Sequence, residues 1–180
     1  KYLFNNEKIN DQIISLKTFT NRNIKLEPQE IPGYQFKYWQ KTSENLLLPM
    51  GSTWKYWDRN NIPANNWHTK AYNDASWSQG KAQLGYGDMF PNVATTISYG
   101  GNANNKYLTA YFRSILNINS LDTKDNFLIT VYMDDGACVY VNGVEIGRYN
   151  LPSGPLNFNT TTNTWNNGEE VDFVVPKNLL

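Results

Sequence analysis

The dipeptide Asn142-Gly143 constrains the fold of this chain more than any other feature of its sequence. Asn-Gly is the preferred pair for a type I′ turn, because the twist of that turn matches the twist of two antiparallel strands. The segments on either side, 137–141 and 144–147, mix β-branched and apolar residues as a half-buried β-ribbon does. We therefore predict a β-hairpin here.

Alternation of apolar and polar residues predicts further strands along the chain. The segments with this pattern are 13–19, 24–26, 34–38, 95–99, 127–133 and 170–174. Runs rich in Asn, Thr and Gly at 102–105 and 157–167 are typical of long polar loops. The chain is therefore predicted to be all-β.

The chain has 180 residues, which suits either one sizeable domain or one domain together with a fragment of another. We place the main boundary near Pro49, where an apolar run at 46–48 gives way to Gly-Ser-Thr-Trp. Residues 1–48 are predicted to be the C-terminal part of a preceding small β domain or a linker. Residues 49–180 are predicted to be the main domain.

Composition excludes several classes of function. Sixteen basic and sixteen acidic residues cancel, so no net field favours nucleic acid or an anionic membrane. The sequence has no apolar run long enough to span a bilayer, and we expect no membrane insertion. Cys138 is the only cysteine, which excludes a disulfide within the chain and a multi-cysteine zinc site. Aromatic residues make up 14% of the chain, which favours either a thick aromatic core or surfaces that stack on sugars.

Five segments beyond residue 48 carry motifs that resemble, in the right order, those of galactose-binding-like jelly-roll modules. These modules occur in large secreted proteins of Bacteroidetes-type bacteria, beside metallophosphoesterases and in multidomain surface proteins. The segments are 49–58 (PMGSTWKYWD), 72–77 (YNDASW), 80–88 (GKAQLGYGD), 108–113 (LTAYFR) and 134–143 (DDGACVYVNG).

The resemblance implies a two-sheet jelly-roll β-sandwich in a secreted protein that is attached to the cell surface and exported by the type IX route. It also implies a final strand after residues 171–180, which the sequence does not contain. A sheet without that strand would expose an edge, which proteins usually cover. We therefore expect the chain to belong to a longer polypeptide, whose neighbouring domains contact it, or a second chain to complete the sheet edge.

The sequence does not predict an enzyme. If Asp134 and Asp135 are neighbours on a strand, their side chains point to opposite faces of the sheet. Glycoside hydrolysis needs two carboxylates that face one cleft, about 5 to 10 Å apart. Arg113 on a central strand would need an acidic partner if it were buried, and we predict that Asp134 or Asp135 is that partner.

Carbohydrate binding is the functional hypothesis that the sequence favours, because sugar rings stack on exposed aromatic side chains while polar groups bind the hydroxyls. The candidates on loops are Trp57, Trp67, Trp77, Tyr86 and Trp165, whereas Trp54, Tyr111, Phe112 and Tyr140 are expected in the core. The alternative is a structural spacer that packs on a neighbouring domain. A binding module must leave two or more aromatic residues exposed around a polar groove, whereas a spacer would bury nearly all of them.

No motif in the chain requires a cofactor. A structural calcium ion is the one metal that the sequence leaves open, because calcium needs only six to eight oxygen ligands from loops. The candidate ligands are Asp58, Asp74 and Asp88, with Asp134 and Asp135 as further carboxylates.

Overall fold

The computed structural model describes residues 47–87, 93–118, 127–166 and 168–180, all of which belong to one structural unit that begins at Asn45. The strands expected before residue 47 lie outside these residues, so the assignment of 1–48 to a preceding domain stays a prediction. In the described part, the elements are β-strands except for one 3-10 helix, Lys177–Leu179. The prediction of an all-β chain is therefore confirmed. No helix among these residues is long and apolar enough to cross a membrane.

One antiparallel sheet has the strand order β2-β1-β5, with β1 at Thr53–Trp57, β2 at Ser78–Lys81 and β5 at Tyr111–Arg113. The register pairs Lys55 of β1 with Arg113 of β5. Because directly paired residues lie on the same face of a sheet, these two cations are neighbours. This register allows both cations to form ion pairs with one carboxylate, as described below.

A second antiparallel pair joins β6 (Phe127–Met133) to β9 (Glu169–Val175) along their full lengths. Both strands follow the predicted ones closely, since the expected segments were 127–133 and 170–174. The side chains alternate between faces: Phe173 is buried, while its neighbour Val174 is 67% exposed. This period of two is the sign of a sheet with one covered face.

The hairpin predicted from Asn142-Gly143 is confirmed, with β7 at Ala137–Val141 and β8 at Val144–Tyr149. Asn142 has φ +48° and Gly143 has φ +93°, and both values are positive, as a type I′ turn requires. The short strands β3 (Leu84–Gly85) and β4 (Thr95–Thr96) pair in parallel. The strand expected at 95–99 is therefore shorter than predicted.

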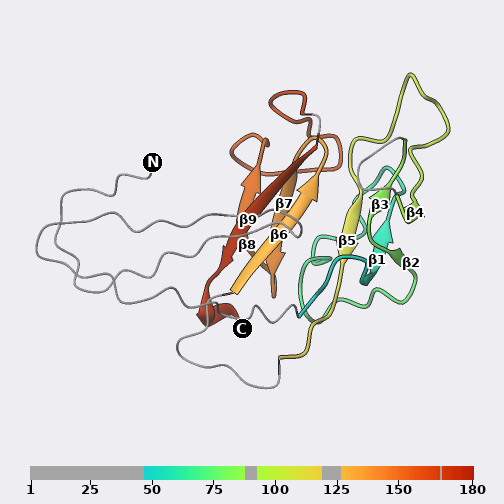
Figure 1. Cartoon of the computed structure of the whole chain (residues 1–180). Helices are drawn as coiled ribbons and strands as arrows, with labels where there is room; N and C mark the ends of the chain where they lie inside the picture. Colours follow the sequence, from blue (N-terminus) through green and yellow to red (C-terminus); the bar gives the residue numbers. More distant parts are fainter. Residues whose placement is uncertain (1–46, 88–92, 119–126, 167) are drawn as a thin grey trace, which may run out of the picture. The chain divides into compact units, whose positions relative to one another are not determined.

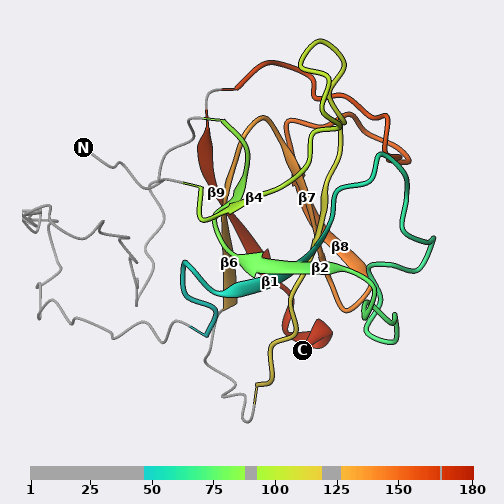
Figure 2. The same cartoon turned by 90° about the vertical axis from the view of Figure 1, so that its right-hand side faces the viewer.

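The strands form two groups. In Figure 1 the β6–β9 pair and the β7–β8 hairpin lie together, apart from β1, β2 and β5, and in Figure 2 β1 and β2 cross in front of the first group. Trp67 joins the groups, because its ring centroid lies 5.0 Å from that of Tyr111 on β5 and 5.5 Å from that of Tyr140 on β7. Among the described residues, the buried apolar side chains are Trp77, Ile97, Tyr111, Met133, Phe173 and Val175.

The core predictions hold for one strand residue and fail for its neighbour. Tyr111 is 8% exposed, as expected for a core position, but Phe112 is 37% exposed. Phe112 follows Tyr111 on β5 and therefore points to the opposite face of the sheet. Trp54 and Tyr140, also expected in the core, are half-buried.

Gly147 lets β8 approach β9 closely. A methyl group at Gly147 would stand 2.7 Å from Phe173 Cδ1, and the buried Phe173 ring has little room to move aside. We expect Gly147→Ala to reduce the free energy of unfolding by about 1–3 kcal/mol in urea titrations, through overpacking. Val144→Ala, at an exposed position on the same strand, should change it by less than about 0.5 kcal/mol. Equal losses in the two variants would contradict the role of this contact.

Candidate functional site

Three of the tryptophans predicted to bind a ligand contact one another instead. The Trp77 ring centroid lies 6.0 Å from that of Trp57 and 6.4 Å from that of Trp67. Trp77 is only 6% exposed, and its Nε1 donates a hydrogen bond to the Tyr72 hydroxyl at 3.2 Å. The prediction that Trp77 presents its ring to a ligand was therefore wrong. Its indole belongs to an aromatic cluster with Trp57, Trp67 and Tyr72.

Trp57 and Trp67 are half-buried, and other side chains of the protein contact their rings. The guanidinium carbon of Arg59 lies 4.2 Å from the Trp57 ring centroid, and Trp57 Nε1 donates to Asn61 Oδ1 at 2.9 Å. Trp67 receives the edges of Tyr111 and Tyr140, as described above. Both residues are less exposed than Trp165, which is 79% exposed.

Asp74 is the acidic partner of both Arg113 and Lys55. Arg113 Nε lies 3.0 Å from Asp74 Oδ2, and Lys55 Nζ lies 2.8 Å from Asp74 Oδ1. The prediction that Arg113 pairs with Asp134 or Asp135 was therefore wrong. The cross-strand register sets the two cations side by side, and the turn before Trp77 brings Asp74 to them.

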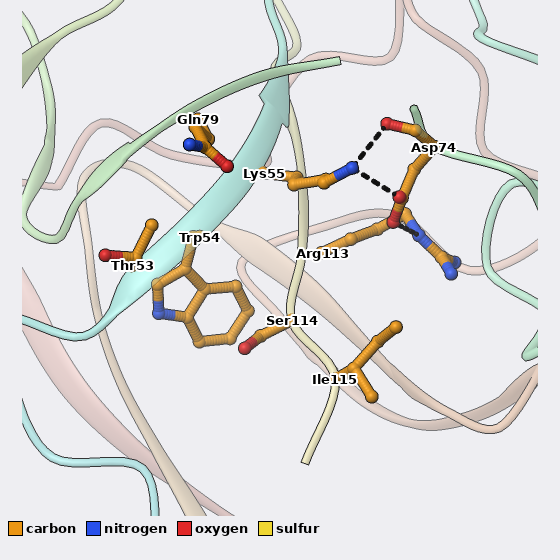
Figure 3. A pocket seen from close by; sticks show the side chains of 8 residues that line it. All are labelled: Thr53, Trp54, Lys55, Asp74, Gln79, Arg113, Ser114 and Ile115. Carbon is orange, nitrogen blue, oxygen red and sulfur yellow. Dashed lines mark hydrogen bonds and ion pairs between the residues drawn. The ribbon is translucent and has the colours of Figure 1, made fainter. Parts of the chain in front are cut away.

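These three charged residues line a pocket of about 300 Å³ (Figure 3). Its other lining residues are Thr53, Trp54, Gln79, Ser114 and Ile115. Arg113 Nη1 also donates to the carbonyl oxygens of Trp67 and Thr69. Burial opposes ionisation of Asp74, but hydrogen bonds from Lys55 and Arg113 outweigh it and lower the pKa of Asp74. The charges are thus engaged within the protein, and we interpret the triad as structural.

Asp134 and Asp135 lie in the connection between strands, because β6 ends at Met133 and β7 begins at Ala137. Strand alternation, which was expected to separate their side chains, therefore does not apply to them. Burial, and then the charges of both carboxylates, raise the pKa of the Tyr86 phenol. Burial and the charge of Asp135 also raise the pKa of Asp134. The two carboxylates and Tyr86 are thus close enough to influence one another.

Tyr86 pairs with Tyr99 from another loop. Their ring centroids are 5.2 Å apart and their planes are inclined at 56°. The ammonium of Lys106 lies 5.1 Å from the Tyr86 centroid and 5.8 Å from the Tyr99 centroid. These distances allow cation–π attraction to both rings.

Trp165 is the most exposed of the predicted ligand residues, at 79%. Asn150 Nδ2 donates to the carbonyl oxygens of both Asp135 and Thr164, at 2.9 and 2.7 Å. On the other side of Trp165, the backbone N–H of Asn166 donates to Asp135 Oδ1 at 2.8 Å. Both neighbours of Trp165 are therefore tied to the connection that carries Asp135.

The connection after β6 and the loops 98–110 and 150–166 lie at the same end of the unit, the upper end in Figures 1 and 2. We give the name loop-end site to six side chains that come from these loops or, for Tyr86, contact a residue of one of them: Tyr86, Tyr99, Lys106, Asp134, Asp135 and Trp165. Sequence reasoning identified Tyr86 and Trp165 as ligand candidates. It missed Tyr99 and Lys106, whose only signal was their position at the two ends of a Gly- and Asn-rich loop.

The carboxylates predicted to bind calcium do not gather in the described residues. Asp58 Oδ2 accepts a hydrogen bond from the backbone N–H of Ser98 at 2.6 Å, and Asp74 is held by two cations. Asp88 lies outside the described residues. Within those residues, no group of three or more His, Cys, Asp or Glu side chains could hold a metal ion. A structural calcium ion therefore stays a prediction.

The loop-end site combines one open indole, two tyrosine rings, an ammonium and two carboxylates. Such a set can stack on an apolar ring face and exchange hydrogen bonds with hydroxyl or amino groups around it. Known proteins do not add to this description: no protein-family model, curated protein sequence or solved structure matches the chain.

Proposed function

We propose that residues 49–180 form a non-catalytic carbohydrate-binding module that uses the loop-end site. The observation that carries the proposal is the exposed ring of Trp165, whose chain neighbours Thr164 and Asn166 are hydrogen-bonded to Asn150 and Asp135. An indole exposed at this level loses contact with water favourably when a sugar ring covers it. The partner would be a polysaccharide or a glycan.

The proposed architecture is a galactose-binding-like jelly roll in a large secreted or surface-attached bacterial protein. Its support is the ordered series of motifs from 49–58 to 134–143, together with two groups of strands whose pairs are antiparallel except for β3–β4. Jelly-roll modules offer two places for a ligand, a sheet face or the loops at one end. The exposed Trp165 and the carboxylates Asp134 and Asp135 come from loops at one end of the unit, which favours the second place.

A spacer role is the alternative, and one surface favours it. Leu128 on β6 and Val174 on β9 are cross-strand partners, and they are 50% and 67% exposed. Exposed apolar side chains that lie side by side mark surfaces on which another domain can pack. The two roles use different residues, so separate variants can distinguish them.

Trp165→Ala tests the binding role. We expect the unsubstituted chain to bind at least one glycan on an array with a Kd of roughly micromolar to millimolar, and Trp165→Ala to weaken that binding about tenfold or more. The double variant Leu128→Ala/Val174→Ala is the matched control, because it removes exposed apolar area elsewhere and should leave glycan binding unchanged. The screen is run with and without calcium. Absence of binding to every glycan at millimolar concentration would defeat the proposal.

A further inference from the structure

The ammonium of Lys106 lies over the two tyrosine rings of the loop-end site, where the cation of a ligand could bind. Its ammonium lies within 6 Å of both ring centroids, at 5.1 Å from Tyr86 and 5.8 Å from Tyr99. The two rings, inclined at 56° to each other, can therefore both attract a single positive charge. The chain thus satisfies a cation-binding site with one of its own residues.

The backbone that presents Lys106 is fixed, although the side chain is exposed. The backbone N–H of Tyr107 donates to the Tyr99 carbonyl at 3.0 Å and closes the loop. The Tyr107 ring lies against Gly100, where a methyl group would come within 2.4 Å of it. Only the flexible lysine side chain has to move for another cation to reach the rings.

Two carboxylates, Asp134 and Asp135, act electrostatically on Tyr86, beside the ammonium of Lys106. Glu169 lies beside the same connection, because Asn166 donates to both Asp135 and Glu169. Lys106 is the cation that contacts the tyrosine pair among the described residues. An incoming cation would therefore meet carboxylates that Lys106 does not neutralise in full.

We infer that the loop-end site selects a carbohydrate with a free ammonium group, that is, an amino sugar whose nitrogen is not acetylated. The ammonium replaces that of Lys106 over Tyr86 and Tyr99, while the sugar ring stacks on Trp165. The carboxylates would repel an acidic sugar. A neutral sugar has no cation that could replace the Lys106 ammonium over the tyrosine rings. This inference rests on the proposed carbohydrate binding and names its ligand class.

The test compares two matched oligosaccharides, a glucosamine hexamer and an N-acetylglucosamine hexamer, at a pH below the pKa of the sugar amine. Isothermal titration with the full chain should give about tenfold tighter binding of the glucosamine hexamer. Equal affinity for the two hexamers would overturn the inference and leave the proposed function standing. No binding of either hexamer would overturn the inference, whereas the proposed function falls only if the whole glycan array is also negative.

Two variants test the roles of the residues. Lys106→Ala removes the internal competitor and should tighten binding of the glucosamine hexamer severalfold, while Asp134→Asn should weaken it severalfold. Glu145→Gln removes one negative charge near the Asn142-Gly143 turn, at the other end of the β7–β8 hairpin, and should leave the affinity unchanged. Hexalysine is the last probe: an affinity equal to that of the glucosamine hexamer would show selection for the ammonium alone and overturn the sugar assignment.

Discussion

Trp77→Ala is expected to reduce the free energy of unfolding by about 3–5 kcal/mol, the range for a truncated core tryptophan. Trp77 is buried, and its ring contacts those of Trp57, Trp67 and Tyr72. Truncation removes these contacts and leaves a cavity in the core. It also removes the hydrogen bond from the indole N–H to the Tyr72 hydroxyl.

Urea unfolding followed by circular dichroism measures this loss without depending on the fluorescence of the residue that is removed. Trp165→Ala is the matched control, because it makes the same substitution at a ring that is mostly exposed. Its expected effect on stability is within about 0.5 kcal/mol. If the two variants lost equal stability, Trp77 would not be the centre of the aromatic cluster.

Asp74→Ala is expected to reduce the free energy of unfolding by about 3 kcal/mol, because it leaves two cations without their shared carboxylate. The side chains of Asp74 and Arg113 are 14% and 11% exposed, so water replaces the lost partner poorly. Lys55, at 34%, is more accessible and contributes less. Asp74→Asn keeps the shape and should recover only part of the loss.

The pH dependence of stability identifies the charge on Asp74 as the cause. Burial raises the pKa of this carboxyl, but Lys55 and Arg113 lower it further than burial raises it. The stabilisation is therefore complete above the ordinary pKa of 3.8 and is lost as the pH falls through the lowered value. In urea titrations across this window, Asp74→Ala should lack the contribution. A parallel decline in both proteins would contradict the assignment.

The sequence predicted best where structure depends on neighbouring residues. The turn at Asn142-Gly143 is a local matter of positive φ, and the strands at 127–133 and 170–174 follow from alternation. Alternation failed for Asp134 and Asp135 because a pattern locates a strand but not its last residue. β6 ends at Met133, two residues too early for the rule to apply to the pair.

Contacts between distant segments could not be predicted from one sequence. Arg113 finds Asp74, 39 positions away, through the register of β1 and β5, which residue types alone do not set. The tryptophans show the same difficulty. Trp77 and Trp165 both stand in polar surroundings in the sequence, yet one ring is buried and the other exposed. The loop-end site also draws on four separate segments of the chain, so its composition emerged only in three dimensions.

The hydrogen bonds of Asn150 determine where the sequence of this protein can change. Its side chain bonds Thr164 through the backbone N–H, the hydroxyl and the carbonyl oxygen, and its own carbonyl accepts from Asn163. These bonds close residues 151–162 into a loop at its base, and the entropy of closing such a loop depends only weakly on its length. Arg148 of β8 donates to the carbonyl oxygens of Pro152 and Gly154, which ties the first part of this loop to the strand. Insertions or exchanged sequences are therefore best accommodated between residues 155 and 162. The segment is a natural position for grafting a foreign peptide or for diversifying a binding surface.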